Sequence, residues 1–243
     1  MKKNTMMRIA SVLLVVVLLT TSVISGTFAK YVVSDNSFDS ARVAAWGVNV
    51  VASGDDLFNN AYTDTTNGLT VKGAADAKVV APGTSNAEFA ATGLTFAITG
   101  APEVAVKITY NFTVTNDIFL KKGVDYKNDT TGGNPDDTYR FDDEDYYPVV
   151  FTLSDKSGVI ATGNLAAIKA KFDELTNNSE KIAANTVLNN TYVLTWAWEF
   201  GDPANNLKDT TLGNLVTGAA STDPANYSLN LEYALAITVE QVD

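Results

Sequence analysis

Strict alternation of apolar and polar side chains along residues 103–115 is the feature that most constrains the fold of this chain. The apolar positions recur at every second residue: Val104, Val106, Ile108, Tyr110, Phe112 and Val114. Because successive side chains of a strand point to opposite faces, this period predicts a strand with one face in a core and one in water. Such strands are typical of antiparallel sheets. A strand of this length would run ~40 Å at about 3.3 Å per residue, so we expect a bend or a bulge within it.

The same period recurs elsewhere in the chain. In residues 42–51, the side chains on the predicted core face are Ala44, Trp46, Val48 and Val50. Residues 191–200 place there Tyr192, Leu194, Trp196, Trp198 and Phe200. Residues 227–239 place there Leu229, Leu231, Tyr233, Leu235, Ile237 and Val239. We also expect strands at residues 69–71, 78–80 and 146–153, and a turn at Ala81-Pro82-Gly83.

These segments predict an all-β fold: an antiparallel, jelly-roll-like β-sandwich with one or two short helices in the connections. The clearest helix covers residues 163–177, where Asn164 can cap the N-terminus. Its apolar residues recur at helical spacing: Leu165, Ile168, Phe172 and Leu175. We expect this helix to pack across one end or face of the sandwich. Residues 55–73 and 121–145 are rich in polar residues and Gly, so we expect them to be loops, the second one exposed.

The beginning of the chain has the order of a secretory signal peptide. Its parts are the positive charges of Lys2, Lys3 and Arg8, an apolar run over residues 9–19, and small residues around Thr27-Phe28-Ala29. The apolar run is shorter than the ~20 residues that span a bilayer, so we expect a signal peptidase to cleave between Ala29 and Lys30. The competing interpretation is a retained anchor, which would hold the uncleaved chain at the membrane.

Cleavage would divide the chain into a signal peptide, residues 1–29, and one mature domain, residues 30–243. The new N-terminus would be a short segment with high strand propensity: Lys30, Tyr31, Val32, Val33 and Ser34. Because this segment becomes free to pair only after cleavage, we expect it to be the assembly element, with residues 30–41 as a donor-strand arm. In the competing case, the segment folds back and pairs within its own domain.

The chain contains no His and no Cys. Their absence removes the commonest general base and the commonest zinc ligand, as well as the Ser-His and Cys-His pairs of nucleophilic enzymes. The formal net charge is −11, which argues against binding to nucleic-acid phosphates or to anionic lipids. We therefore expect a protein secreted to the extracellular matrix or cell surface, without catalysis and without a resident cofactor.

Clustered acidic residues are the strongest chemical feature of the mature chain. They are Asp136, Asp137, Asp142, Asp143, Glu144 and Asp145. Hard oxygen ligands at close spacing suit Ca²⁺, so the aspartates are candidates for a weak calcium site. The pattern of an EF-hand loop is missing from this segment. A solvated acidic loop is therefore the competing interpretation.

Trp196 and Trp198 lie beside Glu199 and have two interpretations. On an exposed surface they would form a platform for a sugar, whereas their position on one strand face with other aromatic residues favours the core. Paired carboxylates also serve glycoside hydrolysis, but the sequence does not show which carboxylates would meet across a cleft.

Several segments together resemble the TasA/camelysin family of secreted proteins from Gram-positive bacteria. The signal peptide ends in Gly26-Thr27-Phe28-Ala29, which is similar to the G-T-[WF]-A ending cut by that family's dedicated signal peptidase. Further resemblances follow in order along the chain: Asp35, Phe38 and Ala41 after the cleavage site, the turn Ala81-Pro82-Gly83-Thr84, and the Trp-containing segment at residues 192–200 with residues 209–213 after it.

This resemblance implies a jelly-roll subunit of biofilm matrix fibres whose freed N-terminal strand inserts into a neighbouring subunit, with accessory matrix proteins as further partners. Some family members are described as zinc metallopeptidases, an activity that does not carry over to a chain without His. Our first hypothesis is therefore a structural subunit of an extracellular fibre. The alternatives are a monomeric secreted adhesin or carbohydrate-binding module and, third, a hydrolase that uses acidic residues.

Overall fold

The computed structural model describes residues 32–36, 47–53, 57–64, 69–86, 94–128 and 138–242. The chain divides into two compact units, Met1–Tyr31 and Val32–Asp243, and all described residues belong to the second. The predicted signal peptide and its cleavage site between Ala29 and Lys30 lie outside the described residues. Within the described ranges, no helix has the length and apolar character needed to cross a membrane.

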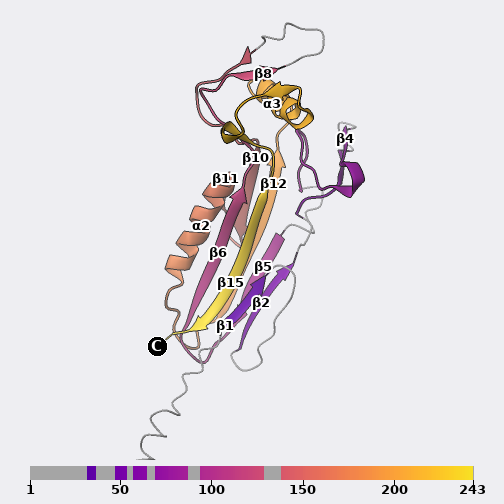
Figure 1. Cartoon of the computed structure of the whole chain (residues 1–243). Coiled ribbons are helices and arrows are strands. Elements are labelled where there is room, and N and C mark those ends of the chain that lie inside the picture. The colour runs from indigo at the N-terminus through magenta and orange to yellow at the C-terminus, as the bar shows by residue number, and fades with distance from the viewer. Residues whose placement is uncertain are drawn as a thin grey trace, which may run out of the picture. The chain divides into compact units, whose positions relative to one another are not determined.

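Two antiparallel sheets form a β-sandwich (Figure 1). The larger sheet has the order β11-β10-β12-β5-β2, and its strands are β2 (Val48–Ser53), β5 (Leu94–Gly100), β10 (Val149–Asp155), β11 (Gly158–Gly163) and β12 (Leu188–Trp198). The smaller sheet has the order β1-β15-β6, and its strands are β1 (Val32–Asn36), β6 (Val106–Asn116) and β15 (Glu232–Gln241). Buried apolar side chains of both sheets belong to one core. The prediction of an antiparallel, all-β sandwich is therefore confirmed.

Shorter elements gather at one end of the sandwich, where Figure 1 shows β8 beside α3 (Asn206–Thr217). One small sheet contains β8 (Tyr126–Asn128), β9 (Thr138–Tyr139) and β13 (Ala220–Ser221). Two pairs of strands complete the set: β7 (Phe119–Leu120) with β14 (Tyr227–Ser228), and β3 (Ala61–Asp64) with β4 (Leu69–Lys72). Two short 3₁₀ helices, η1 (Ala74–Asp76) and η3 (Pro224–Asn226), lie in the connections.

Strand β6 has the predicted alternation, because Val106, Ile108, Tyr110 and Phe112 are buried in the core. The expected irregularity is also present. Its partner β15 shifts register between Glu232, which pairs with Asn116, and Tyr233, which pairs with Val114. The intervening residue of β6 has no direct partner on β15, which is the definition of a β-bulge.

Helix α2 (Leu165–Asn178) confirms the predicted helix. The Asn164 side chain caps it by accepting a hydrogen bond from the backbone N–H of Ala167 at 3.0 Å. Its apolar face is fully buried and consists of Leu165, Ile168 and Phe172. The helix packs against β6 of the smaller sheet and against β10 and β11 of the larger one. It therefore covers the side of the sandwich where these two sheets end.

Some local expectations are wrong. Residues 78–80 form no strand, and Phe200 lies beyond the end of β12 and is 64% exposed. Residues 121–145 are not simply an exposed loop, because Tyr126 and Phe141 are buried and stack with their ring centroids 6.2 Å apart. Residues 55–73 contain the β3–β4 hairpin, of which only the second strand was predicted. Strands β5 and β11 and helix α3 were not predicted.

Asp117 carries a charge that the fold partly desolvates. Its Oδ2 accepts a hydrogen bond from the N–H of Leu165 at 3.0 Å, at the start of α2. Burial nevertheless raises the pKa of Asp117 from 3.8 to about 6, outweighing the hydrogen bonds from backbone amides. The folded state therefore binds this proton more tightly than the unfolded state does. The resulting stabilisation is complete below pH 3.8 and is lost as the pH rises through about 6.

We expect Asp117→Asn to remove this loss, because the amide oxygen can still accept from Leu165 while the buried charge is gone. At pH 7.5 the free energy of unfolding of the variant should exceed that of the parent by about 1–2 kcal/mol, after allowance for solvent screening. At pH 4.5 this difference should be smaller. Urea unfolding at both pH values measures the effect, with Glu103→Gln at an exposed position as the control. Equal pH dependence in the parent and the Asp117 variant would contradict the assignment.

Candidate functional site

Strand β1 is an edge strand of the smaller sheet. In the sheet order β1-β15-β6, it bonds within the described residues to β15 alone. The pairing is antiparallel and opposes Val32 to Glu240, Val33 to Val239 and Ser34 to Thr238. Figure 1 shows the three strands of this sheet together. Residues far apart in the chain, the start of the second unit and its C-terminal strand, therefore form one edge of the sandwich.

The predicted assembly segment is described only in part. Val32, Val33 and Ser34 lie in β1, whereas Lys30, Tyr31 and residues 37–41 of the predicted arm lie outside the described residues. In the single chain, Val32–Asn36 pairs with β15 of the same domain. This is the fold-back arrangement that the sequence left open as the competing case.

Strand β15 does not depend on β1 for its place in the sheet. On its other side it pairs with β6 from Glu232 to Gln241, whereas β1 covers only the part from Ala236 to Glu240. Its core-facing residues Ile237 and Val239 are buried. Removal of β1 would therefore leave β15 in position with a free edge and an apolar inner face.

The backbone pairing of β1 holds this strand only weakly. A net intramolecular hydrogen bond contributes about 0.5–1.5 kcal/mol, and ordering the backbone of one residue costs about 1–2 kcal/mol. The two effects have similar size along a strand of five residues. Edge strands of this kind can accept or exchange partners, so β1 is a candidate for exchange.

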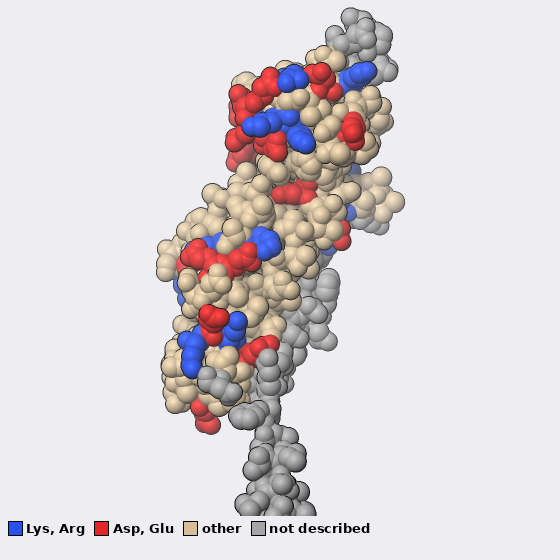
Figure 2. Space-filling model, turned by 60° about the vertical axis from the view of Figure 1, so that its left-hand side comes forward, with Lys and Arg blue, Asp and Glu red and all other residues tan. Residues whose placement is uncertain are grey.

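The described acidic candidates for calcium, Asp142, Asp143 and Asp145, form no common metal site. Asp136 and Asp137 lie outside the described residues. Asp142 Oδ1 lies 2.9 Å from a guanidinium nitrogen of Arg140, and Asp145 Oδ1 accepts from the N–H of Lys122 at 3.0 Å. No group of three or more acidic side chains that could hold a metal ion occurs in the part of the chain that the structure describes, which includes Asp143. Figure 2 shows acidic and basic side chains mixed at the end of the molecule that carries β8 and α3, at the top of the view.

The tryptophan pair belongs to the core, as the strand periodicity favoured. Trp196 is 2% and Trp198 is 6% exposed, so neither offers a flat face to a sugar. The Trp196 Nε1–H donates to the backbone oxygen of Leu57 at 2.7 Å. The Trp198 Nε1–H donates to Asp209 at 3.0 Å. The Trp196 indole therefore ties the end of β12 to a connection that is distant in sequence, and the Trp198 indole ties it to α3.

Asp209 is the residue with a chemical environment that the sequence reasoning missed. Its Oδ1 accepts hydrogen bonds from the Tyr146 hydroxyl at 2.6 Å and from Trp198 at 3.0 Å. Burial raises the pKa of Asp209, while these two hydrogen bonds lower it. Lys208 Nζ lies 5.0 Å above the ring centroids of both Phe141 and Tyr146. In the sequence, residues 209–213 belong only to the resemblance, which gives Asp209 no chemical role.

Comparison of this chain with protein-family models, with curated proteins and with solved structures finds no match.

Proposed function

We propose that this chain is a structural subunit of an extracellular fibre or biofilm matrix, and that subunits join by exchange of β1. The observation that carries the proposal is the position of β1: a strand of five residues at a sheet edge, on a partner that β6 holds independently. The signal-peptide pattern and the resemblance to secreted matrix proteins support an extracellular location. The proposed role requires no catalysis.

Exchange would replace β1 by the same strand from a neighbouring subunit. Because the incoming strand is identical and can take the same register, the contact energy changes little. The outcome then depends on concentration, since a strand of the same chain competes as if at an effective concentration of order mM. A head-to-tail contact of this kind generates filaments when the rotation between subunits does not close a ring, and its affinity comes from main-chain hydrogen bonds.

Signal cleavage would control the timing of this exchange. The predicted cut between Ala29 and Lys30 falls just before Val32, the first residue of β1. An uncleaved chain would keep this strand tethered close to the membrane. We infer that cleavage frees β1 only after export, which limits premature pairing at an open sheet edge.

An engineered disulfide between β1 and β15 tests the proposal. The chain has no native Cys, so Ser34→Cys combined with Thr238→Cys introduces a single pair. These residues are opposed in the register, and opposed Cα atoms lie about 4.5–5.5 Å apart, a distance that a disulfide can bridge. In dilute solution, oxidation should give an internally bonded monomer. In assembled material, it should give a ladder of covalent multimers on a non-reducing denaturing gel.

The matched control joins β15 to its other neighbour. Thr109 on β6 is also opposed to Thr238, so Thr109→Cys with Thr238→Cys should give only bonded monomers, whether the protein is dilute or assembled. The single variant Ser34→Cys reports random cross-linking. Assembled material that yields only monomers from the Ser34–Thr238 pair would overturn strand exchange, and a processed chain that forms no fibres at high concentration would overturn the proposed function itself.

A further inference from the structure

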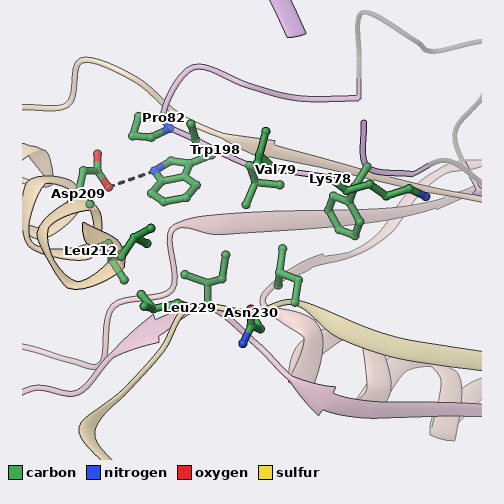
Figure 3. A pocket seen from close by; sticks show the side chains of 15 residues that line it. Lys78, Val79, Pro82, Trp198, Asp209, Leu212, Leu229 and Asn230 are labelled. Atoms are coloured by element: carbon green, nitrogen blue, oxygen red, sulfur yellow. Dashed lines mark hydrogen bonds between the residues drawn. The ribbon is translucent and has the colours of Figure 1, made fainter. Parts of the chain in front are cut away.

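A pocket of about 470 Å³ lies between α3, residues 78–82 and the connection from β14 to β15 (Figure 3). Most of its lining is apolar and includes Val79, Trp198, Leu212, Leu229 and Leu231. Its volume falls within the range of pockets that hold small molecules. No residue of β1 lines the pocket, so an occupant would not compete with the proposed strand exchange.

One end of the pocket carries a carboxylate. Figure 3 shows Asp209 at this end, with its hydrogen bond to Trp198. Within the described residues, the hydrogen bonds that this carboxylate accepts from Tyr146 and Trp198 reach the same oxygen, Oδ1. Neither occupies Oδ2. Burial raises the pKa of Asp209, which means that water solvates this carboxylate poorly, so a cation placed beside it would compensate for the lost solvation.

The charges around this end favour a positive ligand. Asp202 acts on Asp209 as a like charge, whereas Lys208 acts as an opposite charge. The Lys208 ammonium lies over the rings of Phe141 and Tyr146, and Lys208 does not line the pocket. The whole chain has a formal net charge of −11. At the Asp209 end this field favours cations. The lining also contains the basic residue Lys78, which Figure 3 shows at the opposite end of the pocket from Asp209.

Gly213 is a lining residue without a side chain, in a helix where another residue type would be more favourable. This residue lies inside α3 and lines the pocket. Apart from its chain neighbours and the backbone of its own helix, no heavy atom of the described residues would lie within 4 Å of a Cβ placed on Gly213. Packing therefore does not require glycine here, and alanine would favour the helix by about 1 kcal/mol. Gly213 is exposed, so glycine at this position leaves open space beside the pocket lining.

We propose that this pocket binds a small apolar molecule with an ammonium group, which pairs with Asp209 while the hydrocarbon lies against Trp198, Leu212 and Leu229. The ammonium group would donate a charge-assisted hydrogen bond to the carboxylate. The hydrocarbon would gain from burial of each methylene group. Such a site gives the domain a ligand-binding activity that is separate from assembly.

Three probes with the same eight-carbon chain and different head groups test this site: octylammonium, octanol and octanoate. Titration of the processed protein, followed by calorimetry and by ¹H–¹⁵N chemical shifts, measures each dissociation constant. We expect octylammonium to bind about tenfold or more tightly than octanol, because only the ammonium makes a charge-assisted hydrogen bond. Octanoate should bind most weakly of the three. The largest chemical-shift changes should fall on α3 and on residues 229–231.

Two variants of α3 separate occupation of the pocket from general adsorption. Gly213→Leu fills the pocket and should abolish binding of all three probes. Thr210→Leu adds the same side chain at an exposed position of the same helix that does not line the pocket, and it should leave binding within about twofold. Equal binding of all probes, binding that survives Gly213→Leu, or no binding of any probe would each overturn the proposal.

Asp209→Asn tests the ion pair. The amide oxygen can still accept from Tyr146 and Trp198, but the negative charge is gone. We expect this variant to bind octanol as the parent does and to lose the preference for octylammonium. A preference that persists would show that the ammonium pairs elsewhere and would contradict the role of Asp209. If this variant does not fold, the comparison of head groups on the parent and on Gly213→Leu decides the question.

Discussion

Replacement of Phe172 by alanine is expected to destabilise the domain by about 3–5 kcal/mol. The Phe172 side chain is completely buried on the inner face of α2. Its ring centroid lies 5.6 Å from that of Phe96 on β5 and 5.1 Å from that of Phe112 on β6. Because these partners come from different sheets, truncation of this one side chain leaves a cavity where the helix joins both layers.

Urea unfolding followed by tryptophan fluorescence measures this loss. Small domains typically have a total stability of about 5–15 kcal/mol, so the variant should unfold at much lower urea or not fold at all. Phe172→Leu, which keeps most of the volume, should lose much less and so keeps the test informative. Asp173→Ala, at a neighbouring exposed position of the same helix, should change the stability by less than about 1 kcal/mol. A loss below this value for Phe172→Ala would show that α2 does not close the core.

The elements that could be predicted have signals within their own sequence. The alternation in β6 and the combination of Asn164 with apolar residues at helical spacing in α2 involve neighbours in the chain. Each pattern is long enough to distinguish the two-residue period of a strand from the 3.6-residue period of a helix. Strand β5 has the same alternation at Leu94, Phe96 and Ile98, all buried. Its signal was present but covers only a short segment.

The ends of strands depend on partners that are remote in sequence. The alternation of β12 continues to Phe200, but β12 ends at Trp198, where its pairing with β10 ends at Val149. The backbone then turns at Gly201, which has a φ of +90°. Similarly, Val79 has the residue type of a strand, but its N–H donates to Asn59 in a connection. A strand requires a neighbouring strand as well as strand propensity.

The candidate sites show the same limit. The strand propensity of residues 32–34 was visible in the sequence. Their partner on β15 is adjacent in space but lies about 200 residues later in the chain, and the sequence does not show this pairing. Tyr126 was hidden in a polar segment, although its hydroxyl donates to the backbone oxygens of Lys121 and Asn226. Asp209 becomes distinctive only because the fold brings Tyr146 and Trp198 to it. Propensity is local, whereas a site needs residues from several elements.

Deletion of residues 30–36 is expected to give a processed protein that folds but forms no fibres. The deletion removes β1 completely, while β15 keeps its pairing with β6 from Glu232 to Gln241. The core strands remain, so we expect a modest loss of stability, about 1–3 kcal/mol, from the lost backbone pairing along the edge of β15. Electron microscopy measures fibre formation, and circular dichroism with urea unfolding measures the fold.

A control variant that carries residues 30–36 in scrambled order separates the loss of the strand from the loss of chain length. A synthetic peptide with the native order of residues 30–36 should bind the deleted protein and should also stop fibre growth of the intact processed protein, because it occupies the edge of β15 without offering an acceptor of its own. Fibres of unchanged length and yield from the deleted protein would defeat strand exchange. Unfolding of the deleted protein in dilute solution would instead favour pairing of β1 within its own domain.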